Sequence, residues 1–166
     1  MLTIQKATMK HWDDIGGIYE RARSFMRETG NPNQWKFTHP LPEMLQEDID
    51  KGNLYVVLDE KDVLGVFALL YGEDPTYAYI EGSWLNNDTY VTIHRIASAG
   101  KKSGILNAAI HYALGQSDNV RIDTHHDNKV MQHLLSKLGF SKCGIIYLEN
   151  GEPRIAYQYE KKSALK

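Results

Sequence analysis

The chain has 166 residues, of which 42% are hydrophobic and 24% charged, a composition typical of a folded globular domain rather than of a disordered chain. Its 19 basic and 21 acidic residues give a formal charge of −2, which argues against a general nucleic-acid binder and against a protein that adheres to anionic membranes. The length suits one domain that spans residues 1–166.

The cysteine content and the apolar runs indicate the compartment. The single cysteine, Cys143, excludes an internal disulfide and a cysteine-rich zinc site, and we interpret it as a small buried thiol rather than a nucleophile. Residues Met1–Lys6 lack the basic segment and long apolar run of a secretory signal. No stretch approaches the roughly 18 apolar residues that a spanning helix needs. We therefore expect a cytoplasmic protein in a reducing environment.

The first half of the chain predicts a strand, two helices and a series of strands. Residues 2–7 alternate in polarity as a half-buried strand does, and Thr8 caps a helix that runs to about Thr29 with apolar residues on one face. A second helix begins at Pro42 and ends near Gly52. Strand-like runs follow at 54–58, 63–71, 77–81 and 90–98.

The second half predicts helices alternating with strands. A helix leads from the turn at 100–104 to about Gln116, and a later helix is capped by Asp127 or Asn128 and ended by Gly139. Strands are expected before, between and after these helices, at 120–124, 140–148 and 154–159.

The last two strands flank Asn150-Gly151, a strong hairpin signal, and residues 161–166 are expected to be a frayed tail. The element order predicts an α/β (α+β) fold. We expect a mixed, mostly antiparallel central sheet of about seven strands with helices on both faces.

A turn rich in glycine and lysine, Gly100-Lys101-Lys102-Ser103-Gly104, lies between a predicted strand and a predicted helix. Unpaired backbone N–H groups at a helix start favour a bound anion, and two lysines add local positive charge. The turn matches neither a Walker loop nor G-x-G-x-x-G. From the residues alone, an anion site and a solvated loop with surface lysines are both open.

Two blocks of the second half, in this order and spacing, give the chain a resemblance to a known family. Ile93-His94-Arg95-Ile96-Ala97, the Gly/Lys turn and the following helix resemble the acyl-CoA-binding core of the GNAT superfamily of N-acetyltransferases. The block from Asn128 to Phe140 resembles the N-x-x-A-x-x-L-Y-x-K-x-G-F motif of that family. The I-H-R-I-A strand and the I-D-T-H-x-D-N segment are similar to those of a bacterial subgroup.

The resemblance implies a fold with splayed fourth and fifth strands, at 90–98 and 120–124, and a pantetheine arm of acetyl-CoA inserted between them. It implies that the backbone of Ile96 and Ala97 bonds this arm as an added strand would. Asn128 matches the motif residue that contacts the arm, and it is equally suited to be a plain helix cap. The residues implied in cradling the pyrophosphate are Lys101, Lys102, Ser103, Gly104 and Ile105.

The implied chemistry is direct attack of an amine on a thioester, and it needs a general base more than a general acid because the amine is mostly protonated at neutral pH. His94 is the first candidate, since histidine suits proton transfer near neutrality and His94 lies two residues before Ile96. Its alternative is a packed histidine. Glu81 is the second candidate, near the cleft or at an exposed strand end. Asp123 and His125 are the third, unless they cap the next helix.

The departures from the motif concern the acid and the turn. The family's usual acid is a tyrosine whose position is Leu135 here, so the acid is another group, a water, or none, and Tyr147 on a nearby predicted strand is a candidate. Leu106 replaces a small residue of the turn motif. The Ala97 N–H is a candidate donor to the thioester oxygen.

Loop aromatics and histidines suggest the acceptor side of the site. Gln34, Trp35, Trp84 and His125 are candidates for the acceptor pocket, although large loop aromatics more often cover a core edge. The run His125-His126-Asp127, with His133, raises a metal hypothesis. No spacing such as H-E-x-x-H is present, so we expect no metal ion.

The leading hypothesis is an acetyl-CoA-dependent N-acetyltransferase whose acceptor is a primary amine on a small molecule or a peptide. The main alternative is a catalytically weak or inactive CoA-binding module for sensing or interaction, suggested by Leu106 and Leu135. A metal-dependent hydrolase is disfavoured. Neither a nucleic acid nor a membrane is expected as partner, and the oligomeric state is left open, a homodimer included.

Overall fold

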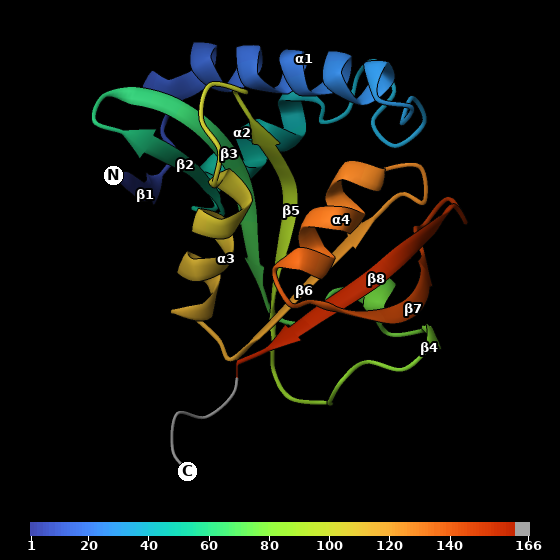
Figure 1. Cartoon of the computed structure of the whole chain (residues 1–166). Coiled ribbons are helices and arrows are strands. Elements are labelled where there is room, and N and C mark those ends of the chain that lie inside the picture. The colour runs from blue at the N-terminus through green and yellow to red at the C-terminus, as the bar shows by residue number, and fades with distance from the viewer. Residues whose placement is uncertain (162–166) are drawn as a thin grey trace.

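Eight strands, most of them predicted from apolar runs, form one sheet in the computed structural model of the chain, which describes residues 1–161 (Figure 1). Residues 162–166, within the expected frayed tail, lie outside the described residues. The strands are β1 (Leu2–Lys6), β2 (Leu54–Asp59), β3 (Asp62–Tyr71), β4 (Glu81–Gly82), β5 (Val91–Ser98), β6 (Asn119–Thr124), β7 (Ser141–Tyr147) and β8 (Pro153–Glu160). The helices are α1 (Trp12–Glu28), α2 (Pro42–Asp50), α3 (Ile105–Leu114) and α4 (Lys129–Lys137), with short 3-10 helices η1 (Met9–His11) and η2 (Pro75–Tyr77).

The sheet has the order β1-β2-β3-β5-β6-β8-β7-β4, and all neighbours are antiparallel except β5 and β6. The predicted mixed, mostly antiparallel sheet is therefore confirmed, with the two-residue β4 as an additional edge strand. Within residues 1–161, none of the helices has the length and apolarity that a bilayer crossing requires.

Helix boundaries follow the predicted capping residues closely. Pro42 occupies the first turn of α2, and Asn128 caps α4 by accepting the Met131 N–H at 3.0 Å. Thr8 caps η1, which precedes α1, so the long first helix begins with one tighter turn. Gly151 (φ +87°) lies in the turn between β7 and β8 and confirms the hairpin.

The strand predicted at 77–81 is wrong in the structure. The Asp74 carboxylate accepts the Thr76 N–H at 2.9 Å and Pro75 occupies the first turn, which makes this segment the 3-10 helix η2. The side chain of Tyr77 packs with Tyr90, with Ile146 of β7 and with Ala156 of β8 in a small core, instead of alternating in a strand. Tertiary burial of one aromatic residue thus overrides the local strand signal.

Helices cover both faces of the sheet and enclose two large cores (Figure 1). Helices α1 and α2 pack on the face that carries Val66, Ala68 and Ala97. Helix α3 packs on the opposite face, where a Cβ at Gly65 would lie only 2.5 Å from Ile105 Cγ2, so the glycine lets the helix start approach β3. The beginning of α3 is thereby placed beside the end of β5.

Candidate functional site

The parallel strands β5 and β6 separate soon after they begin. They pair only at Val91–Val120 and Thr92–Arg121, and Figure 1 shows them diverging from this shared start. The remainder of β5, up to Ser98, has β3 as its neighbour on the other side. The predicted splay of the fourth and fifth strands is confirmed, and it leaves backbone groups of β5 facing a gap that a ligand strand can fill.

A β-bulge in β5 bends the strand away from β6. Ala68 pairs with His94 but Val66 pairs with Ala97, so two residues of β5 oppose one of β3. Within the bulge, Arg95 has φ +53°, a conformation that costs a non-glycine residue on the order of 1–3 kcal/mol. The surrounding structure has to hold this conformation in place.

Both helices on that face hold the bulge through long-range contacts. The Tyr19 hydroxyl of α1 donates to the Arg95 carbonyl at 2.6 Å, and Tyr19 is almost fully buried. The Arg95 guanidinium forms a bidentate pair with Asp48 of α2, at 2.9 and 3.0 Å. Sequence reasoning placed Arg95 in a motif but did not find these partners, because they lie 47 and 76 residues away along the chain.

The start of α3 has the features of an anion site. Gly104 caps the helix with φ +91° and offers no side-chain acceptor, so the first N–H groups of α3 are left without a side-chain cap. Lys101, Ser103 and Gly104 are exposed there. Leu106 stands where the turn motif has a small residue. Its side chain is buried in the core and does not cover the N–H groups at the helix start.

Two cations besides Lys101 lie in or beside this turn: Lys102, which the sequence predicts, and Arg21, which it does not. Lys102 Nζ lies 2.8 Å from Asp59, whose pKa is lowered by that hydrogen bond and charge. Arg21 of α1 donates to the Ser98 carbonyl at 3.2 Å, and a side chain at Gly100 would collide with its guanidinium. Lys101, Lys102 and Arg21 with an uncapped helix start suit a pyrophosphate group, so the residues present fit the phosphate end of acetyl-CoA.

His94 lies between two carboxylates on the opposite face of the sheet from α3. Its Nε2 is 2.9 Å from Asp74 Oδ2, and its Nδ1 is 4.0 Å from Asp123 Oδ2. Burial by itself raises the pKa of Asp74, but hydrogen bonds from His94 and from Thr76 outweigh it and lower the pKa to about 2. Asp74 is therefore ionised at neutral pH and fixes the orientation of the imidazole.

Tyr77 extends the network of His94, Asp74 and Asp123 by a hydrogen bond to Asp123. Its hydroxyl donates to Asp123 Oδ2 at 2.6 Å, and burial together with the Asp123 charge raises its pKa well above the usual value. Tyr77 therefore stays neutral and remains a donor. Asp123 is one of the candidates that the sequence offers. Asp74 lies in the connection between two predicted strands and Tyr77 at the start of the strand wrongly predicted at 77–81, and neither position carries a local signal of a site residue.

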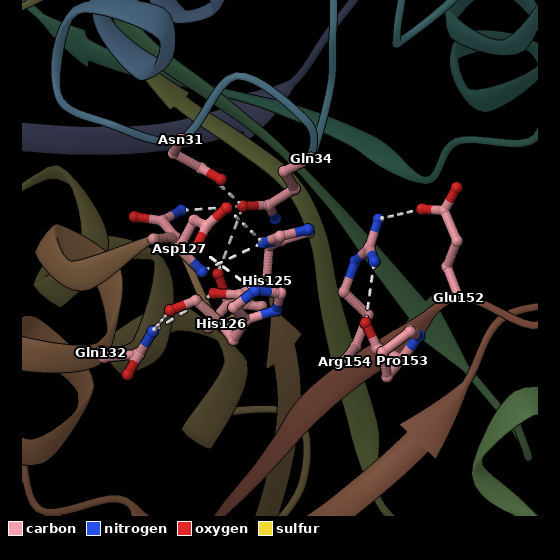
Figure 2. A network of polar contacts seen from close by, with 11 residues as sticks. Asn31, Gln34, His125, His126, Asp127, Gln132, Glu152, Pro153 and Arg154 are labelled. Atoms are coloured by element: carbon pink, nitrogen blue, oxygen red, sulfur yellow. Dashed lines mark hydrogen bonds and ion pairs between the residues drawn. The ribbon is translucent and has the colours of Figure 1, made fainter.

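The loop between α1 and α2 reaches the end of β6 through Gln34. Gln34 Oε1 accepts the side-chain N–H groups of Asn31 at 2.9 Å and Asn128 at 3.0 Å (Figure 2). The predicted residues Gln34 and Asn128 are thus brought together at the open end of the gap. Trp35 is 7% exposed and packs on Tyr19, which makes it a core residue at this position.

The other predicted catalytic residues lie elsewhere. The Tyr147 hydroxyl donates to Glu81 Oε1 at 2.7 Å, but this exposed pair is on β7 and β4, with β6, β8 and β7 between β4 and β5. The expectation that Glu81 borders the cleft is therefore wrong, because β4 pairs with the far edge of the sheet. Trp84 packs on Tyr77 and on the Arg121 guanidinium, 4.0 Å from the ring centroid.

His125 and its neighbours form a compact turn before α4. The Asp127 N–H donates to His125 Nδ1 at 3.0 Å, and the rings of His125 and His126 stack at 4.3 Å (Figure 2). Ligand atoms of His125, His126 and Asp127 lie within 4.8 Å of one another. His125 Nδ1 already accepts the Asp127 N–H, which disfavours this nitrogen as a metal ligand. The expected absence of a metal ion stays a prediction.

Two further features are a half-buried thiol and a wide surface depression that reaches Asp74 and Tyr77. Cys143 is half-buried rather than buried, and burial raises the pKa of its thiol, which disfavours the thiolate. A wide depression of about 1680 Å³ opens at the end of the sheet where β5 and β6 begin, and Asp74, Tyr77 and Arg121 are among its lining residues. Neither His94 nor the anion turn lines that depression.

Comparison with solved structures places the chain among acetyltransferases. A GNAT-family acetyltransferase of Streptococcus agalactiae 2603 is 30% identical with a TM-score of 0.87, over 98% of this chain and 96% of that one. A proposed acetyltransferase of Staphylococcus aureus Mu50 is 24% identical with a TM-score of 0.70, over 96% and 99% of the two chains.

A GNAT-family acetyltransferase of Listeria monocytogenes 4b F2365 shares the fold at 18% identity, with a TM-score of 0.70 over 96% of this chain and 94% of that one. No protein-family model and no curated protein matches the sequence.

Proposed function

Because the chain belongs to the GNAT family of acetyltransferases, we propose that it moves the acetyl group of acetyl-CoA to a primary amine on a small molecule or a peptide. The observation that carries this proposal is the gap between β5 and β6, which joins a basic, uncapped helix start on one face to the His94 network on the other. A donor can enter the gap from the α3 face and an amine can meet it from the His94 face.

On the donor side the chain contributes charge and backbone groups. The N–H groups at the start of α3, with Lys101 and Arg21, hold the pyrophosphate, and the gap-facing backbone of β5 at Ile96 bonds the pantetheine arm. Bound acetyl-CoA supplies a thioester that an amine can attack directly. A backbone N–H of β5 that faces the gap, at the bulge beside Ile96, donates to the thioester oxygen as negative charge develops there; the Ala97 N–H itself points to β3, its pairing partner.

On the acceptor side His94 takes the proton of the amine. Asp74 is ionised and accepts from Nε2–H, which leaves the Nδ1 lone pair free to act as the base. The 4.0 Å separation from Nδ1 to Asp123 leaves this nitrogen accessible, and both carboxylates stabilise the imidazolium that forms. Leu135, at the position of the family's tyrosine acid, is fully buried and cannot donate a proton. The proposed reaction does not need that acid, because a thiolate leaves with less help than an amine.

Two measurements test the proposal together. Isothermal titration should show acetyl-CoA binding, and a library of primary amines should give acetyl-CoA-dependent release of free thiol. No binding at high micromolar acetyl-CoA contradicts the proposal. Binding without thiol release in a single-turnover experiment favours the alternative of a CoA-binding module, which the replacement of the motif tyrosine by Leu135 suggests.

A further inference from the structure

Arg154 is a buried cation with too little negative charge around it. It lies on β8, on the same side of the strand as Ala156 and Gln158, and it is 5% exposed. Its guanidinium donates to the Pro153 carbonyl at 2.8 Å and to Glu152 Oε1 at 3.4 Å (Figure 2). Glu152 is itself partly exposed and also faces Lys36 at 3.9 Å. Burying a charge with so long a contact is costly unless another anion joins it.

Arg154 shares its surroundings with the candidate site. The pKa of His39, in the loop before α2, is lowered to about 4 by burial and then by the charges of Arg95, Arg154, His94 and Arg23. His39 therefore lies within the electrostatic reach of all four side chains. Register agrees with this placement: Ala156 pairs with Asp123 of β6, so Arg154 lies just beyond the end of β6, on the face that carries His94.

The charges around His39 divide into two groups. Asp48 neutralises Arg95 through a bidentate pair, and Asp74 pairs with His94. Arg23 donates to the His39 carbonyl at 3.4 Å, which carries no formal charge. Among the charges of residues 1–161, Arg154 thus has only the long contact to Glu152, whereas His94 has Asp74 at its Nε2 and Asp123 at its Nδ1.

We propose that the acceptor amine also carries a carboxylate, as an amino acid does, and that Arg154 binds this carboxylate while Asp74 and Asp123 attract the ammonium group. The inference rests on the proposed transfer to an amine and narrows its substrate class. A guanidinium offers a planar pair of donors that matches a carboxylate, and the Glu152 carboxylate already approaches it. The substrate carboxylate replaces Glu152, which turns to the solvent.

The first test compares matched acceptors. We expect amino acids to be acetylated with a kcat/KM about ten- to a hundredfold higher than their carboxamides and decarboxylated amines, the range of a charge-assisted hydrogen bond. Arg154→Met should remove this preference and leave the acetyl-CoA affinity unchanged, and Arg154→Lys should restore part of it. Lys142→Met, an exposed change on β7, is the matched control and should retain the preference. If carboxamides or O-phosphoethanolamine are acetylated with the same kcat/KM as amino acids, the inference is refuted.

A second measurement does not depend on turnover. With CoA present, an N-acetyl amino acid should bind more tightly than its amide, as isothermal titration measures. Glu152→Gln removes the competing carboxylate at a partly exposed position and should strengthen this binding several-fold, which keeps the test valid if Arg154→Met does not fold. If acetyl transfer occurs but shows no preference for acceptors with a carboxylate, this inference is refuted and the proposed function is not. If carboxylate binding depends on Arg154 but no acetyl transfer occurs, the proposed function is refuted and this inference is not. If the acid and the amide bind equally well, the inference is refuted whatever the activity.

Discussion

Replacing Asp74 by asparagine separates the two roles that the structure gives this carboxylate. Asp74 Oδ1 accepts the Thr76 N–H and hydroxyl at 2.9 and 2.7 Å, and Oδ2 lies 2.9 Å from His94 Nε2. An asparagine keeps the shape and one acceptor oxygen. It removes the charge that fixes the imidazole with Nε2–H toward residue 74.

The magnitude follows from the pKa of Asp74. Hydrogen bonds from His94 and Thr76 overcome burial and lower it from 3.8 to about 2, and one unit corresponds to about 1.4 kcal/mol. The ionised carboxylate thus contributes about 2 kcal/mol to the free energy of unfolding at neutral pH. Because the folded pKa is the lower one, this contribution is present above about pH 4, falls to about half at pH 3 and disappears below about pH 2.

Urea unfolding at pH 7 and at pH 3 measures this contribution. Asp74→Asn should lower the free energy of unfolding by about 2 kcal/mol at pH 7, and the difference from the wild type should shrink by about half at pH 3. Asp88→Asn, an exposed change in the loop between β4 and β5, should have no such effect. Since a general base contributes about 10²–10⁴ in rate, kcat should fall by at least tenfold in Asp74→Asn with little change in acetyl-CoA affinity. A stability difference independent of pH, with unchanged kcat, refutes the assigned role of Asp74.

Three further substitutions test other parts of the site. His94→Ala should lower kcat by about 10²–10⁴ without altering the acetyl-CoA affinity measured by titration, and an unchanged pH–rate profile removes His94 as the base. Gly104→Asp, at φ +91°, places a negative charge and a strained residue at the helix start and should weaken acetyl-CoA binding at least tenfold; equal affinity contradicts the anion site. Tyr19→Phe removes the 2.6 Å hydrogen bond to the Arg95 carbonyl and should cost about 1 kcal/mol in urea unfolding, whereas unchanged stability contradicts its role in holding the bulge.

Local signals in the sequence predicted the parts of the fold that local physics determines. Pro42, Asn128 and Asn150-Gly151 marked helix starts and a hairpin correctly because capping and turn formation involve residues only a few positions apart. The splay of β5 from β6 is expected from the ordered motifs, and the basic helix start and His94 are recognisable from the residues themselves.

The rest depends on contacts between distant residues. Asp74 meets His94 across 20 residues, and Tyr77 meets Asp123 across 46. The segment 77–81 resembles a strand because its aromatic residues have high strand propensity, and only the burial of Tyr77 against β7 and β8 reveals its course. Arg154 gave no sequence signal, since one arginine in a strand is distinguishable only by its burial and its partners.

The most direct test of acetyl transfer is a single-turnover reaction in which free thiol and acetylated amine are quantified together. The proposal predicts one acetylated amine for each thiol released by the wild-type chain, and neither product above background with His94→Ala. Thiol release without an acetylated amine, or acetylation that proceeds equally well without His94, contradicts it.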